Sequence, residues 1–109
     1  MKVIKEYLAY RNIYMWRNNS GSYETNGRYI SYGKAGTADL LGVYPGGRFF
    51  AIEVKRPGGA LSPAQIEFLR EVRKRGGVAL VAESVEDVDK CLKDSSYAGV
   101  PKFAKHLEM

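Results

Sequence analysis

The sequence contains one cysteine, one histidine and no long apolar run. Cys91 has no partner for an intrachain disulfide, and zinc sites built from cysteine and histidine are excluded because they need several such ligands. The apolar runs fall far short of the roughly 18 to 20 residues that cross a bilayer. Polar residues come too early at the N-terminus for a signal peptide, so we expect a reducing, cytoplasmic location.

Signatures of several other protein classes are also missing. The chain has no GxxxxGK[ST] phosphate loop, no GxGxxG fingerprint, no repeat and no linker. Its 109 residues, 45% hydrophobic and 27% charged, fit a single globular domain spanning residues 1–109. Lysine and arginine outnumber aspartate and glutamate by 17 to 12, for a net charge of +5, which favours a polyanionic partner.

The centre of the chain predicts a β-hairpin. Residues 36–44 and 48–55 are rich in apolar, β-branched and aromatic residues and flank the turn-forming segment 45–47. If this segment forms a three-residue loop, Asp39 lies directly opposite Glu53. A loop of even length would place the two carboxylates on different faces, so the prediction depends on this register.

The faces of this hairpin differ in chemistry. Lys55 shares the face of Glu53 and Asp39, because alternate side chains point to the same side of a strand. The other face is apolar, with Phe50, Ile52 and Val54. Two opposed carboxylates repel each other unless a hard cation such as Mg²⁺ or Mn²⁺ lies between them. The alternative is a solvated sheet face on which Glu53 and Lys55 have no catalytic role.

Three short motifs occur in a specific order. They are Gly36-Thr37-Ala38-Asp39, Ile52-Glu53-Val54-Lys55 and Leu61-Ser62-Pro63-Ala64-Gln65. This series resembles the G-x-x-D, E-x-K and L-S-x-x-Q motifs of virus-type replication-repair nuclease (VRR-NUC) domains, which belong to the PD-(D/E)XK superfamily. The resemblance extends from about Glu6 to Val88 and is typical of the stand-alone phage and bacterial members.

The resemblance implies an α/β fold with an αβββαβ core, in which helices flank a mixed sheet. It also implies that Mg²⁺ or Mn²⁺ is bound by Asp39, Glu53 and the carbonyl of Val54, with Lys55 assisting the attacking water. Glu6 is a candidate for a further ligand, because the first helix of related nucleases often supplies an acidic residue. From helical periodicity alone, Glu6 is a solvated residue at the margin of that helix.

Gln65 has two interpretations. Ser62 and Gln65 have the spacing of a capping box, with Pro63 at the first helical position, which explains the glutamine without catalysis. The family pattern instead places Gln65 at the metal site, where its amide orients water or phosphate. We favour the second role.

Cations and tyrosines are concentrated before the hairpin. Arg17, Arg28 and Lys34 are expected to border residues 33–36, where small side chains let a phosphate backbone approach Asp39. We expect residues 18–27 to form a mobile loop after a strand at residues 13–17. Most of the nearby tyrosines are expected to pack rather than to stack on bases; these are Tyr23, Tyr29 and Tyr32.

The remaining elements follow from periodicity and caps. We expect an amphipathic helix over the first dozen residues, a helix from Ser62 to Gly76, a buried strand at 78–82 and a last helix after Ser84. Cys91 is expected in the core and His106 at the surface. Apolar residues near the C-terminus are expected to pack on the domain or on a second subunit; they are Tyr97, Val100, Phe103 and Leu107.

The resemblance implies a metal-dependent, structure-selective DNA endonuclease. Because the stand-alone members of the family resemble Holliday junction resolvases, we expect this chain to resolve four-way (Holliday) junctions as a homodimer. Two copies related by a two-fold axis match the symmetry of a junction with two equivalent strands to cut. The alternatives are a nuclease for flaps or other branched DNA, and a nucleic-acid-binding module of the same fold without catalysis.

Overall fold

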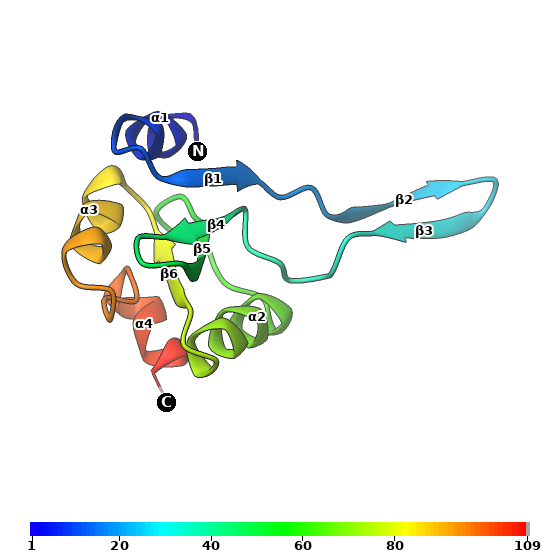
Figure 1. Ribbon diagram of the computed structural model, residues 1–109. Coiled ribbons are helices and arrows are strands. Elements are labelled where there is room, and N and C mark those ends of the chain that lie inside the picture. The colour runs from blue at the N-terminus through cyan, green and yellow to red at the C-terminus, as the bar shows by residue number, and fades with distance from the viewer. Residues whose placement is uncertain (109) are drawn as a thin grey trace.

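The computed structural model describes residues 1–108 as ten helices and strands (Figure 1). In chain order they are α1 (Lys2–Tyr10), β1 (Tyr14–Arg17), β2 (Gly21–Thr25), β3 (Arg28–Tyr32), β4 (Leu40–Tyr44), β5 (Arg48–Val54), α2 (Pro63–Lys74), β6 (Val78–Ala82), α3 (Val85–Lys93) and α4 (Pro101–Leu107). None of the helices within residues 1–108 has the length and apolar character needed to cross a membrane.

Four strands form the central sheet in the order β1-β4-β5-β6. β1, β4 and β5 pair antiparallel, whereas β5 and β6 pair parallel through the crossover helix α2. The sheet is therefore mixed, and α1, β1, β4, β5, α2 and β6 make up the predicted αβββαβ core. The α/β fold class is confirmed.

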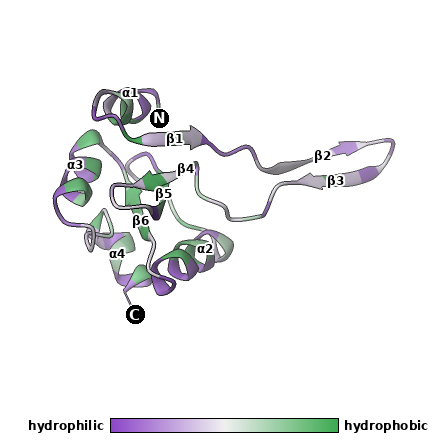
Figure 2. Ribbon diagram, in the orientation of Figure 1, coloured by the Kyte–Doolittle hydropathy of each residue, from purple (hydrophilic) through white to green (hydrophobic). Residues whose placement is uncertain are grey.

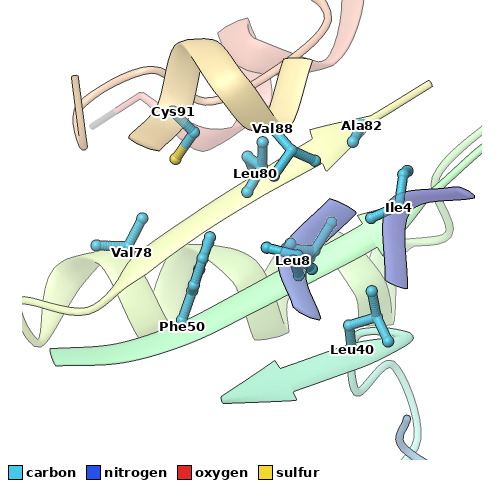
Figure 3. Close-up of a cluster of buried hydrophobic side chains, with 10 residues drawn as sticks. Ile4, Leu8, Leu40, Phe50, Val78, Leu80, Ala82, Val88 and Cys91 are labelled. Carbon is cyan, nitrogen blue, oxygen red and sulfur yellow. The ribbon is translucent and has the colours of Figure 1, made fainter. Parts of the chain in front are cut away.

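Helices cover the two faces of this sheet unequally. α1 and α3 lie over one face, where Leu8, Phe50 and Leu80 are fully buried (Figure 3). α2 and α4 lie over the β5–β6 half of the other face and bury Leu69 and Phe103. Figure 2 shows hydrophobic residues concentrated on β5, β6 and the inner sides of the helices. The face that carries Glu53 is thus not polar throughout, because its β6 side is a second hydrophobic core.

The register of the central hairpin is as predicted. Leu40 pairs with Ile52 and Tyr44 with Arg48, around a three-residue loop that contains Gly46 (φ 98°) and Gly47 (φ 90°). Asp39 immediately precedes β4 and therefore lies across from Glu53 in the continuation of this ladder.

The prediction of a mobile loop at residues 18–27 is wrong. β2 and β3 form a two-stranded hairpin that projects from the body of the molecule (Figure 1). Its turn consists of Asn26 (φ 51°) and Gly27 (φ 72°), the left-handed pair that a tight type I′ turn requires. The Asn-Gly dipeptide was the sequence signal for this hairpin. Every residue of both strands is exposed, so the expectation that the tyrosines here are packing groups is also wrong.

The C-terminal segment packs on its own domain. Phe103 and Leu107 of α4 lie in the core beside α2, and the Val100 N–H donates to the Val81 carbonyl (3.1 Å). Tyr97 donates its hydroxyl to Asp87 (2.9 Å). Of the two alternatives for these residues, packing on their own domain is therefore confirmed. The predictions for the other two residues are confirmed, because Cys91 is buried and His106 is exposed.

Candidate active site

Asp39 is held between the ends of two strands. Its Oδ2 accepts a hydrogen bond from the Val54 N–H (2.8 Å), at the last residue of β5. Its own carbonyl accepts from the Asn18 N–H (2.8 Å), just beyond β1. These two bonds fix the carboxylate at the edge where β1, β4 and β5 converge.

Glu53 is a buried ionisable group. It leaves 3% of its surface exposed, and its Oε1 has no hydrogen-bond partner within residues 1–108. Burial, followed by the neighbouring Asp39 carboxylate, raises the pKa of Glu53 to about 8. A buried acceptor without a partner costs on the order of 1 to 3 kcal/mol, so Glu53 does not occupy this position for the sake of stability.

Lys55 lies beside Glu53 on the same side of the strand end. Its Nζ is 3.7 Å from Glu53 Oε2, and its side chain is largely buried, with 19% exposed. This ammonium group lowers the pKa of Glu53 but is outweighed by burial and by Asp39. The site therefore combines two adjacent carboxylates with one cation.

Gln65 caps α2 and also contacts Glu53. Its backbone N–H donates to Ser62 Oγ (3.2 Å) and its Oε1 accepts from the Ser62 N–H (2.9 Å), which completes the capping box of α2. Its Nε2 also donates to Glu53 Oε2 (3.3 Å). One side chain thus begins the helix with its oxygen and contacts the acidic site with its nitrogen.

Comparison with known proteins identifies the family of this chain. The sequence model of the VRR-NUC domain matches residues 11–86, a span that includes Asp39, Glu53, Lys55 and Gln65. The chain belongs to the VRR-NUC family. Its domain is a nuclease domain of the PD-(D/E)XK type. Neither the curated proteins nor the solved structures contain a match to this chain.

The acidic pair of this VRR-NUC domain suits a divalent cation. Asp39 keeps one carboxylate oxygen beyond the bond to Val54, and Glu53 Oε1 has no partner in the described chain. Carboxylate oxygens are the ligands that Mg²⁺ and Mn²⁺ prefer. A cation between them would ionise Glu53 and remove the mutual repulsion that raises its pKa. The residues present therefore fit the metal that PD-(D/E)XK nuclease domains generally use.

Asp39 and Gln65 line a cleft of about 390 Å³ between α2 and the base of the β2–β3 hairpin. Its walls are mostly hydroxyl-bearing and small residues: Ser20, Gly21, Ser22, Ser31, Tyr32, Gly33, Ala35, Gly36, Thr37 and Ser62. Gly36 has a φ of 81°, and a β-carbon there would lie 2.3 Å from the carbonyl oxygen of Ala64. Only glycine fits this close approach of the loop to α2. The small residues of this loop were predicted from the sequence to border Asp39, whereas the serines were not.

None of the other predicted site residues lines this cleft. Glu6 is exposed on α1, and no group of three or more metal-ligating side chains exists within residues 1–108, so Glu6 joins no such group with Asp39 and Glu53. Arg17 ends β1 next to Asn18, and Lys34 is exposed in the loop before Asp39. Arg28 lies beside the turn of the hairpin, so its expected place near residues 33–36 is wrong.

Proposed function

We propose that this VRR-NUC domain is a Mg²⁺- or Mn²⁺-dependent endodeoxyribonuclease, with the ion held by Asp39, Glu53 and the Val54 carbonyl. The observation that carries the proposal is the buried Glu53 carboxylate, which lies beside Asp39 and retains an oxygen without a partner. A binding module without catalysis gains nothing from two carboxylates that repel phosphate. A metal-dependent hydrolase needs them.

The side chains divide the chemistry between them. The bound ion supplies polarisation of the scissile phosphate and a lower pKa for the attacking water. Lys55 places a positive charge beside Glu53, where it assists the attacking water and offsets the charge that develops on the phosphate. Gln65 lines the cleft and holds the Glu53 carboxylate through Nε2. The serine and glycine walls admit a phosphate backbone.

Cleavage assays on a four-way junction test this proposal. With Mg²⁺ or Mn²⁺ we expect strand cleavage that EDTA stops. Asp39→Asn and Glu53→Gln should each reduce the rate by about 1,000-fold or more, comparable to the loss of a principal electrostatic group. Both variants should still bind the junction, and calorimetric titration with Mn²⁺ should show loss of the site.

Glu86→Gln is the matched control, because Glu86 is an exposed carboxylate on α3. It should leave cleavage and Mn²⁺ binding unchanged. If the wild-type protein binds the junction but cuts no DNA with either metal, the domain is a binding module and the proposal is wrong. Retention of more than a tenth of the activity by Glu53→Gln would also contradict it.

We also propose that the domain resolves four-way junctions as a homodimer. A groove of about 630 Å³ lies between α2 and the start of β5. Its floor is apolar, formed by Ala35, Phe49, Ala64, Phe68 and Val72. Its rim carries charges of both signs, from Lys34, Arg48, Glu67, Glu71 and Arg75. An apolar centre with a mixed-charge rim suits a protein surface better than DNA, and two copies can pair opposite charges about a two-fold axis.

Light scattering at the assay concentration tests the dimer. Phe49 is 43% exposed, so Phe49→Glu should yield a folded monomer. Val3→Glu is its control, because Val3 is 63% exposed on the opposite side of the sheet. We expect this variant to remain dimeric and to cut both strands of the junction. A wild-type monomer that nicks one strand of a flap would support the flap-nuclease alternative instead.

A further inference from the structure

The β2–β3 hairpin presents two chemically different faces. The register pairs Gly21 with Tyr32 and Tyr23 with Ile30, which places these four residues on one face. The rings of Tyr23 and Tyr32 lie on that face with centroids 6.3 Å apart. Tyr32 also covers Gly21, where a β-carbon would lie 3.0 Å from its hydroxyl oxygen. This face is a small aromatic platform.

The aromatic platform is open to solvent. Tyr23 is 51% exposed, Tyr32 48% and Ile30 39%. The substantial contacts between elements of the described chain include none from β2 or β3 other than their mutual pairing. A lone two-stranded hairpin is marginally stable in water. An exposed apolar face on such a hairpin therefore indicates that a ligand covers it.

The opposite face of the hairpin carries Ser22, Glu24, Tyr29 and Ser31. The base of the hairpin borders the active-site cleft with residues of both faces, because Ser22, Ser31, Gly21 and Tyr32 all line the cleft that contains Asp39 and Gln65. A DNA strand in this cleft therefore lies beside the serine hydroxyls and the Tyr32 ring. Hydroxyl groups of this kind contact the phosphate backbone without regard to base sequence.

The hairpin is long enough to reach across a DNA groove but carries no net charge. Strands of five residues extend about 17 Å, which is longer than the roughly 12 Å width of a DNA major groove. Segment 21–32 carries one acidic and one basic residue, Glu24 and Arg28, so its net charge is zero. Its contribution to binding must therefore come mainly from stacking and shape rather than from charge.

We propose that the β2–β3 hairpin is a wedge that inserts at the branch point of branched DNA. Ser22 and Ser31 contact the backbone of the strand to be cut. Tyr23 and Tyr32 stack on the bases that the branch leaves unpaired or terminal. The wedge makes the enzyme selective for branched over linear DNA. This inference rests on the proposed nuclease function. In it, the second subunit of the dimer binds at the groove that contains Phe49, and the hairpin remains free to bind DNA.

The test compares binding to a four-way junction and to linear duplex of the same sequence. Stacking of one base on an aromatic side chain corresponds to about 10- to 100-fold in affinity. The double variant Tyr23→Ala/Tyr32→Ala should therefore lose at least about tenfold of the preference for the junction. Its dependence of affinity on salt should match that of the wild type, because no charge has been removed.

Tyr10→Ala is the matched control, since Tyr10 is 86% exposed on α1. It should keep the junction preference within about twofold. A second readout is 2-aminopurine placed beside the branch point. Its fluorescence should change when wild-type protein binds and should not change with the double variant. Thermal unfolding of both variants should match the wild type, because neither change removes a buried contact.

Three outcomes would overturn the wedge: an unchanged junction preference in the double variant, no preference in the wild type, or conversion of a wild-type dimer to a monomer by the double substitution. The last outcome would assign the hairpin to a subunit interface. Failure of the proposed nuclease function looks different. In that case the wild-type protein binds junctions through the hairpin and cuts nothing with Mg²⁺ or Mn²⁺.

Discussion

Two strands of equal length, β6 and β2, represent opposite extremes of this molecule. All five residues of β6 are buried between helices, and all five residues of β2 are exposed. The packed sheet around β6 is rigid enough to hold the Glu53 carboxylate in an unfavourable buried position. The hairpin contributes little burial, so its side chains are free to serve contacts with a ligand. Stability and recognition are thus assigned to different regions.

The sharpest test of this contrast is a pair of apolar truncations. Leu80→Ala in β6 should reduce the free energy of unfolding by about 3 kcal/mol, because it removes a fully buried side chain from the core. Ile30→Ala in β3 should change it by less than about 0.5 kcal/mol, since Ile30 is 39% exposed. Urea unfolding followed by circular dichroism measures both. Similar losses in the two variants would show that the hairpin is part of the cooperative unit.

The buried site in the packed region should make the metal-free protein sensitive to pH. The folded-state pKa of Glu53 is about 8, well above the ordinary value of 4.5, so the folded protein binds the proton more tightly than the unfolded chain. Stability in EDTA should therefore fall as pH rises from about 4.5 to 8 and level off above that range.

Glu53→Gln should remove this dependence, because a neutral amide cannot ionise. In EDTA at pH 8.5 the variant should be more stable than the wild type although it is inactive. A wild-type protein whose unfolding free energy is flat over this range would contradict the raised pKa. No comparable pH dependence is expected from substitutions in the hairpin.

The smallest expected effect lies where the two regions meet, at Gln65. Ser62→Ala should cost about 1 kcal/mol of stability by removing the cap of α2, without a change in turnover. Gln65→Ala should cost a similar amount and also reduce turnover by about tenfold, because Glu53 loses the Nε2 donor. Parallel measurements of unfolding and cleavage separate the two roles. Equal turnover in the two variants would show that Gln65 acts only as a helix cap.

Local rules predicted much of the central hairpin and its surroundings. The odd-length loop at 45–47 determined that Asp39 faces Glu53, because side-chain direction alternates with a period of two. The capping box at Ser62 located the start of α2, and the apolar run at 78–82 coincided with β6. Each of these signals depends on neighbouring residues, so the linear sequence contains it in full.

Other predictions failed because packing decides them. Tyr23 and Tyr32 have the composition of packing residues, but no helix lies over the hairpin that carries them. From the sequence, Phe103 and Leu107 were equally compatible with a subunit interface and with the core. In the structure the chain passes β6 before α4 begins, and both residues pack beside α2. Burial depends on which distant segments arrive, and periodicity does not contain that information.

Motif order and strand parity were enough to predict the family, the order of the core elements and the opposition of Asp39 and Glu53. Three properties could be seen only in the folded chain. Glu53 is buried with one oxygen unpartnered, Gln65 contacts it while capping α2, and the serines of the hairpin border the cleft that Asp39 and Gln65 line. These properties arise where α2, β5 and the hairpin meet, because desolvation and contact depend on distances between segments remote in the chain.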